Sequence, residues 1–186
     1  MKEINGLIAQ LWYTRDTRST KPNPLDEVKS LIFYLDILYR NVYDDLISDP
    51  DIMKGSSNFN ITFGSWVGAD KDGNPYVTTK VTKEALKIYS NQIISIYKEK
   101  IIELSDDFSV STNFVDCPNR LQRRIKNYSI LLNKEFDHYS KINFDEPFRI
   151  FLSLVFHRLE NFQLNNKGYK SFNEFLEDME IFQNSV

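Results

Sequence analysis

Apolar residues recur along most of this chain at intervals of three and four positions, which is the pattern of an α-helix that buries one face. The first stripe follows Asn23 and Pro24, which suit the N-cap and the first position of a helix, and it stops before Asp49-Pro50-Asp51. The pattern therefore predicts a long helix between these points. Its apolar positions are Val28, Leu31, Leu35, Leu38, Val42 and Leu46.

The same spacing predicts four more helices. The second is long and follows a glycine-rich loop, the third starts just after Pro118, and the fifth begins with a capping box formed by Ser171 and Glu174. The polar stretch that contains His138 is interpreted as a connection between helices. The inward positions of these four helices are Ala85, Tyr89, Ile93, Ile96, Ile101 and Leu104; Leu121, Ile125, Tyr128 and Leu132; Phe148, Leu152, Val155, Leu159 and Phe162; and Phe175, Met179 and Phe182.

Residues 60–63 alternate between polar and apolar side chains and predict a short strand that leads into the glycine-rich loop. No internal repeat and no low-complexity linker interrupts the helical pattern. The predicted fold class is therefore mainly α, a bundle-like helical segment with one short strand before the loop.

Composition narrows the class of protein only a little. The chain has 186 residues, of which 41% are hydrophobic, so it can bury a sizeable core as a single domain. Its net charge of −3 gives no reason to expect a nucleic-acid partner. The single cysteine, Cys117, excludes an internal disulfide and fits a reducing cytoplasm. Without a signal peptide or an apolar run of about 18 residues, we expect a soluble, cytoplasmic protein with no membrane partner.

Two segments carry the most specific pattern in the chain. Residues 63–78 read Phe-Gly-Ser-Trp-Val-Gly-Ala-Asp-Lys-Asp-Gly-Asn-Pro-Tyr-Val-Thr, and residues 11–27 read Leu-Trp-Tyr-Thr-Arg-Asp-Thr-Arg-Ser-Thr-Lys-Pro-Asn-Pro-Leu-Asp-Glu. Both resemble signature segments of the bacterial and plant type of phosphoenolpyruvate carboxylase, in the order and at the distance usual for that family. Weaker similarity continues through residues 104–105, 109–112, 146–149, 152–154 and 158–160, so the resemblance covers nearly the whole chain.

The resemblance implies a parent enzyme that adds bicarbonate to phosphoenolpyruvate and releases oxaloacetate and phosphate, with Mg²⁺ or Mn²⁺ as its metal. The family's catalytic histidine motif would lie upstream of this chain, and its Gly-Arg-Gly-Gly loop and metal ligands would lie downstream. Residues 1–186 are therefore interpreted as a single, mainly helical internal segment of a larger enzyme. We expect it to hold no catalytic residue and no cofactor, to have the rest of a homo-oligomeric parent as its partner, and to be inactive alone.

The role of the glycine-rich loop stays open between two interpretations. It is either a turn scaffold or one wall of the approach to a substrate or effector site. A calcium loop is excluded, because the sixth position counted from Asp70 is proline and the twelfth is valine. We expect no metal there, hydrogen bonds from backbone amides or basic side chains to the two aspartates, and an inward-packed tryptophan. The candidate residues are Trp66, Gly68, Asp70, Lys71, Asp72, Gly73, Asn74 and Pro75.

The loop departs from the family pattern at two positions. Ala69 replaces a glycine, and Lys71 replaces an arginine, which keeps the positive charge but loses the planar, bidentate fork. If the family's arginine holds a carboxylate or phosphate, Lys71 would hold it more weakly.

Basic residues form two further groups. Arg15, Arg18 and Lys21 either meet an anion or acidic surface of the parent or pair locally in a solvated loop. The run from Arg120 to Lys126, which includes Arg124, is interpreted as the solvated flank of a helix.

Two classes of function therefore remain: an enzyme segment, or a non-enzymatic helical interaction module that shares the motif. The sequence that flanks this chain in its gene would distinguish them.

Overall fold

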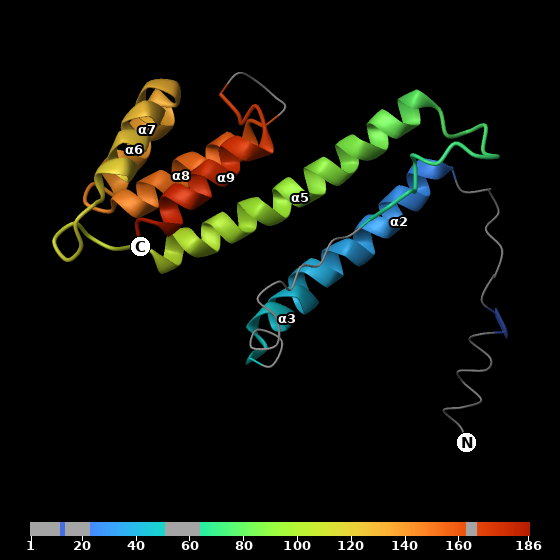
Figure 1. The fold of residues 1–186 in the computed structure, drawn as a ribbon, viewed down its shortest axis with the longest axis horizontal. Coiled ribbons are helices and arrows are strands. Elements are labelled where there is room, and N and C mark those ends of the chain that lie inside the picture. The colour runs from blue at the N-terminus through green and yellow to red at the C-terminus, as the bar shows by residue number, and fades with distance from the viewer. Residues whose placement is uncertain (1–11, 14–22, 51–63, 163–166) are drawn as a thin grey trace. The chain divides into compact units, whose positions relative to one another are not determined.

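The computed structural model describes residues 12–13, 23–50, 64–162 and 167–186 (Figure 1). The chain divides into two compact units, Met1–Tyr89 and Ser90–Val186, and each is described by itself. The described residues form helices and no strand, which confirms the mainly α class. The strand predicted at residues 60–63 lies outside the described residues, and the interpretation of 1–186 as a single segment stays a prediction. No helix in the described part of the chain combines the length and apolarity needed to cross a membrane.

The first unit contains one helical run from Pro24 to Ser48, as the stripe predicted. It consists of α2 (Pro24–Ile37), the π-helix η1 (Leu38–Tyr43) and α3 (Asp44–Ser48). Asn23 starts it with a reciprocal capping box, because its side-chain oxygen accepts from the backbone N–H of Asp26 at 3.0 Å and the Asp26 carboxylate accepts from the backbone N–H of Asn23 at 3.2 Å.

The π-helix changes which positions of the stripe face inward. Val28, in the first turns, is fully buried, whereas Leu38 and Val42 are exposed. A π-helical turn has i→i+5 hydrogen bonds and is wider than an α-helical turn, so it rotates the residues that follow relative to the α-helical pattern. The sequence predicted Leu38 and Val42 inward from a uniform α-helical spacing and was wrong there.

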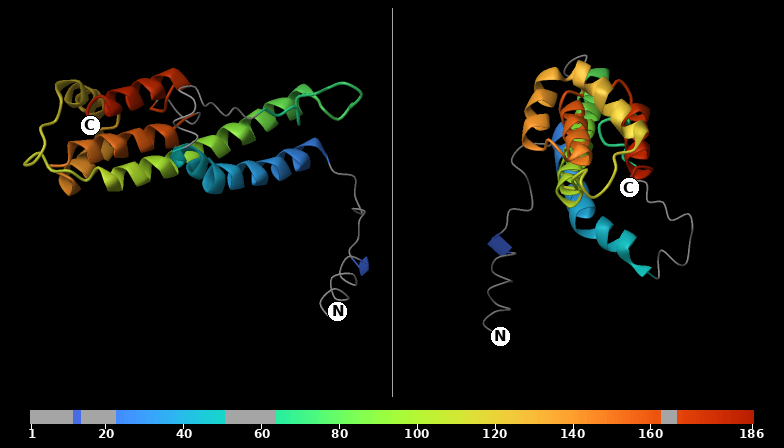
Figure 2. Two further views of the ribbon diagram at one scale, coloured as in Figure 1. Left: turned by 60° about the horizontal axis from the view of Figure 1, so that its bottom comes forward. Right: turned by 90° about the vertical axis from the view of Figure 1, so that its left-hand side faces the viewer.

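The long helix α5 (Thr79–Asp107) begins in the first unit and continues into the second. The second unit adds α6 (Asn119–Leu131), α7 (Asn133–Ile142), α8 (Pro147–Glu160) and α9 (Phe172–Gln183). In both views of Figure 2 the yellow, orange and red helices α6–α9 gather into one bundle. Helix α8 contacts α6, α7 and α9 and supplies much of the core. Its fully or almost fully buried apolar residues are Phe148, Ile150, Phe151, Leu152, Leu154, Val155 and Leu159.

Helix α7 corrects the interpretation of the His138 region as a connection. Leu132, which is fully buried, has φ −121° and ψ 50° and separates α6 from α7, yet its carbonyl already accepts from the backbone N–H of Phe136 at 2.8 Å. His138 lies exposed on this helix. The helix was missed because it has few apolar positions and a polar outer face.

The predicted capping box of α9 is also corrected. Ser171 is the N-cap, but its side chain makes no capping hydrogen bond. The Glu174 carboxylate instead accepts from the backbone N–H of Lys170 at 3.1 Å and from Arg158 Nη2 at 2.9 Å. The Lys170 amide and the Arg158 guanidinium hold the pKa of Glu174 below its usual range. Glu174 therefore bonds to the amide of the residue before the N-cap and to a guanidinium from α8.

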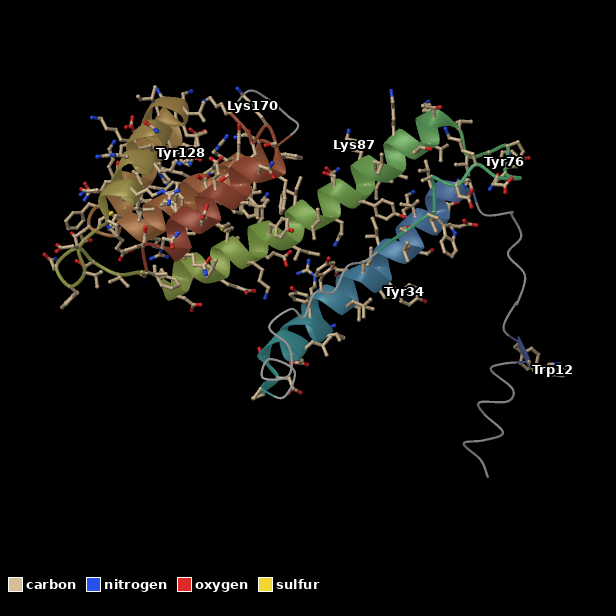
Figure 3. All side chains as sticks on the ribbon, viewed as in Figure 1. Trp12, Tyr34, Tyr76, Lys87, Tyr128 and Lys170 are labelled. Atoms are coloured by element: carbon tan, nitrogen blue, oxygen red, sulfur yellow. The ribbon has the colours of Figure 1, made fainter. Side chains whose placement is uncertain are left out.

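A buried polar network joins α6, α8 and α9 around Arg158. Its guanidinium donates to Tyr128 Oη at 2.6 Å and to the Gly168 carbonyl at 3.2 Å, and it lies 4.0 Å from the centre of the Tyr169 ring. Tyr128, labelled in Figure 3, and Tyr169 both donate to the fully buried carboxylate of Asp178. Burial raises the pKa of Asp178 although these donors and the arginines oppose the shift. The network thus balances charges that the core could not hold singly.

Arg124 belongs to the same network and not to a solvated flank. Its side chain is 25% exposed, and its Nε lies 3.3 Å from Asp178 Oδ1. Its Nη2 lies 3.3 Å from Glu177 Oε2. The sequence placed Arg124 with exposed neighbours such as Arg123 because the carboxylates it meets lie more than 50 positions away along the chain.

We predict that Arg158→Met lowers the free energy of unfolding by about 3–5 kcal/mol, because it removes one of the two arginines that pair with the buried carboxylate of Asp178, Arg124 being the other. Urea unfolding of the purified chain, followed by circular dichroism, measures this loss. The matched control Arg123→Met changes an exposed arginine and should alter stability by no more than about 0.5 kcal/mol. Equal effects of the two substitutions would contradict the assignment of the network as a core element.

Candidate functional site

The glycine-rich loop is held mainly by its own polar side chains. Ser65 Oγ accepts from the backbone N–H of Val67 at 3.2 Å, Asp70 Oδ1 from that of Asp72 at 3.1 Å, and Asn74 Oδ1 from that of Tyr76 at 3.0 Å. Each is a local turn in which a short polar side chain accepts from the amide two residues further on. The loop is therefore ordered from within, as predicted for Asp70.

Backbone bonds and one tyrosine complete the loop. The Trp66 carbonyl accepts from the amides of Ala69 at 2.9 Å and Asp70 at 3.0 Å. Tyr89 on α5 donates to the Val67 carbonyl at 3.3 Å, and its hydroxyl lies 2.9 Å from Ser65 Oγ. The start of α5 thus fixes the first half of the loop.

Gly68 lies where only a glycine fits. Its φ is +80°, a conformation that other residues rarely adopt, and a methyl group added there would lie 2.7 Å from Cβ of Ala85 and 3.2 Å from Val28 Cγ2. Gly73 also has a positive φ, of +66°, but a methyl group there would meet no atom within 4 Å. Gly68 therefore serves both a turn and a close approach, and Gly73 serves a turn alone.

Trp66 does not pack inward, and that prediction was wrong. Its side chain is 77% exposed, and Tyr76, labelled at the loop in Figure 3, is 66% exposed. The inward position of the turn is taken by Gly68 against Val28 and Ala85, a gap too narrow even for a methyl group. Two aromatic side chains therefore point outward from a fixed backbone.

The charged residues of the loop are also turned outward. Asp70, Lys71 and Asp72 are all exposed, and the side chains of Lys71 and Asp72 make no hydrogen bond or ion pair with any residue that the structure describes. The prediction that Asp72 accepts a hydrogen bond is wrong for this part of the chain, whereas Asp70 does accept one. Ala69, the first departure from the family pattern, is exposed too.

A groove of about 600 Å³ runs beside the loop at the N-terminus of α2. It is lined by Asn23, Pro24 and Glu27 from the helix and by residues 72–76 from the loop, Gly73, Asn74 and Pro75 among them. Asp72 and Glu27 make its wall acidic. This groove suits a cationic or hydrogen-bond-donating group better than an anion.

The remaining candidates are placed as follows. Arg15, Arg18 and Lys21 lie outside the described residues, so their interpretation stays a prediction. Within the described ranges no three His, Cys, Asp or Glu side chains converge as a metal site would require, and the one loop carboxylate with a contact, Asp70, is already bonded to an amide. The residues described do not fit the divalent metal that the family resemblance implies.

The structure also brings together residues that the sequence did not indicate. Tyr139 Oη lies 3.1 Å from His157 Nε2, and His157 Nδ1 lies 3.2 Å from Glu160 Oε2. Lys98 Nζ pairs with the other oxygen of Glu160 at 3.3 Å. These residues come from α5, α7 and α8. The spacing of His157 and Glu160 on one helix was the only sequence signal for this chain of contacts.

By its fold and by this loop, the protein is a mainly helical segment. It presents a fixed turn whose aromatic and charged side chains point outward. The family model described as phosphoenolpyruvate carboxylase matches residues 1–185. The chain belongs to the phosphoenolpyruvate carboxylase family.

Individual relatives agree with the family. The chain is 28% identical to the phosphoenolpyruvate carboxylase of Psychromonas ingrahamii over 194 residues, which cover 89% of this chain and 22% of that protein. It is 31% identical to the phosphoenolpyruvate carboxylase of Aeromonas salmonicida over 133 residues, which cover 67% of this chain and 15% of that protein. All of the chain matches 23% of the Prochlorococcus marinus (strain MIT 9215) enzyme at 27% identity. The chain thus spans about a fifth of the length of the curated relatives it matches. No solved structure matches it.

We predict that Gly68→Ala destabilises the chain by about 2–4 kcal/mol. The alanine would have to adopt the unfavourable positive φ of this position, and its methyl group would also overpack the contact with the helices. Gly73→Ala should cost only about 1 kcal/mol, since it meets the unfavourable φ alone. Gly64→Ala meets neither and should be neutral. Urea midpoints of the three variants measure this order. A Gly68→Ala variant as stable as Gly64→Ala would refute the close approach.

We predict that Asp70→Ala lowers the free energy of unfolding by about 1 kcal/mol, because it leaves the Asp72 amide without its acceptor. Asp72→Ala should leave stability within about 0.5 kcal/mol, since its carboxylate has no partner among the described residues. Thermal unfolding of both variants measures the difference. The opposite order, or a rise in melting temperature on adding Ca²⁺ that Asp72→Ala abolishes, would contradict this arrangement.

Proposed function

We propose that this chain is an internal segment of a phosphoenolpyruvate carboxylase, without catalytic power by itself, and that its loop forms part of the approach to a substrate or effector. The family match over residues 1–185 and the small share of each relative that the chain spans support the first statement. The parent reaction, phosphoenolpyruvate with bicarbonate to oxaloacetate and phosphate, would use residues outside this chain. A divalent Mg²⁺ or Mn²⁺ held elsewhere in the parent would stabilise the negative charge of the reacting oxygens.

The division of labour within the motif carries the second statement. Five residues stabilise the loop itself, either by forming its turns or by accepting hydrogen bonds within it: Ser65, Gly68, Asp70, Gly73 and Asn74. The side chains of Trp66, Lys71 and Asp72 have no such role among the described residues. A scaffold alone would not need these three side chain types, so we infer that they meet something outside the segment.

The outward residues suggest what that contact is. An indole on a fixed backbone offers a large, rigid apolar surface, which is typical of a ligand pocket or a partner surface. Lys71 offers one unpaired positive charge beside it, suited to a carboxylate or phosphate group. The acidic groove with Glu27 and Asp72 would take basic side chains from the remainder of the parent. The loop would then stand between a ligand and the rest of a cytoplasmic, homo-oligomeric enzyme.

A non-enzymatic helical interaction module is the second candidate. It is favoured by exposed apolar residues of α2, with Phe33 at 63% and Tyr34 at 61% exposed. Such a surface fits docking onto any partner and does not need the chemistry of the parent enzyme.

A chimera tests the proposal. Residues 64–78 of this chain replace the matching loop of the Psychromonas ingrahamii enzyme, and a second chimera receives residues 1–186. Oxaloacetate formation is followed by a coupled assay with malate dehydrogenase. We predict that both chimeras are active and that the purified 186-residue chain alone shows no turnover, because the catalytic motifs lie outside it.

Within the loop chimera, Trp66→Ala and Lys71→Ala should each lower kcat/KM by at least about tenfold, or about 1.4 kcal/mol, with an unchanged melting temperature. Lys80→Ala, an exposed lysine at the start of α5, serves as the matched control in the larger chimera. Unchanged kcat/KM in both loop variants would show that the loop is a structural scaffold without a role in ligand approach. Loss of activity in a folded loop chimera, or metal-dependent turnover by the isolated chain, would overturn the assignment of roles.

A further inference from the structure

A cleft of about 320 Å³ opens in the second unit between α5, α7 and α8. Its apolar lining includes Ile101 and Leu152, both buried, and the half-buried ring of Phe156. Pockets for small ligands combine such an apolar lining with a few convergent polar groups, and this volume lies at the small end of their range.

Half of the polar side chains that line the cleft are without a partner among the described residues. Asn143 is only 7% exposed, yet its side-chain amide makes no hydrogen bond with any residue of the described ranges. The hydroxyls of Ser105 and Ser153, on facing helices, are likewise without a bond to described residues. Among the described residues, the Asn143 amide is not one of the fully enclosed polar atoms that lack a hydrogen bond. Since Asn143 borders the cleft, a molecule in the cleft can bond to this amide.

One end of the cleft presents a hydrogen-bond acceptor. His157 Nδ1 lies 3.2 Å from Glu160 Oε2, and its Nε2 lies 3.1 Å from Tyr139 Oη, so these contacts hold the Tyr139 hydroxyl in place. The Tyr139 oxygen keeps a lone pair for a donor in the cleft. Burial, with Glu160 and Glu135 nearby, raises the pKa of Tyr139, which keeps this hydroxyl uncharged.

The other end is electrically balanced. Arg149 lies 3.3 Å from Asp106 and 3.4 Å from Glu146, and it also donates to Ser109 at 3.3 Å. Two carboxylates therefore already balance its charge, and an anionic ligand would gain little there. Its remaining N–H groups and the Asp106 oxygens offer one donor and one acceptor site side by side.

We propose that this cleft binds a small, uncharged, polyhydroxylated molecule about the size of a monosaccharide. Each hydroxyl of such a molecule both donates and accepts, as Asn143, Ser105 and Ser153 do. Its C–H face covers the apolar lining at Leu152 and Phe156. The carboxylates of Asp106 and Glu146 beside Arg149 disfavour an anion, and the uncharged Tyr139 offers no charge for an ion to pair with.

Nuclear magnetic resonance titration of the ¹⁵N-labelled 186-residue chain tests the proposal, with myo-inositol and D-glucose as probes and with gluconate and glycine as charged comparisons. We expect millimolar or tighter binding of at least one neutral probe, with shifts of the Asn143 side-chain amide and of α5, α7 and α8 amides. The charged compounds should bind at least about tenfold more weakly.

Variants separate binding from folding. Ser153→Ala and Tyr139→Phe should each weaken binding of the neutral probe severalfold. Asn143→Leu should abolish binding of the probe without lowering the melting temperature. Ser95→Ala, the control at an exposed serine of α5, should change neither the binding nor the melting temperature. Absence of binding by both neutral probes, binding that these variants leave unchanged, or preference for gluconate or glycine would each overturn the proposal. None of these results depends on the carboxylase assignment, which the chimeras test separately.

Discussion

The contact of Gly68 with Val28 and Ala85 is the constraint on which the arrangement of the loop depends. The backbone of the turn lies against α2 and the start of α5 at a distance that no side chain could occupy. Because the turn is seated there, the residues on either side of it are directed away from the helices. The outward position of Trp66 agrees with this close approach of the neighbouring glycine to the helices.

The loop shows how a short motif can serve structure and recognition at once. Its small and turn-forming residues satisfy the backbone locally, so the loop needs little from the rest of the chain except Tyr89 and the glycine contact. Its large and charged residues then remain available for contacts outside the segment. A family signature of this kind is conspicuous in a sequence because both sets of residues lie in one run.

The second unit follows a different principle, since its polar groups lie inside. Arg158 and Asp178 are stabilised by tyrosines and by residues from three helices, and this places a charge-paired network in the core. The cleft at Asn143 is the contrasting case, where polar side chains are brought together without satisfying one another. The first arrangement stabilises the bundle, whereas the second leaves hydrogen-bonding capacity for another molecule.

Sequence alone determined the helices other than α7, the start of the first one at Asn23 and the turns within the loop, because these depend on periodicity, capping and turn chemistry between near neighbours. The sequence also indicated the protein family, since each of the two signature segments is a continuous stretch of the chain. Tertiary structure decided the direction of Trp66, the partner of Glu174, the burial of Arg124 and the cleft at Asn143. Each of these depends on residues that are distant in the chain and adjacent in space, where packing and charge override local preference.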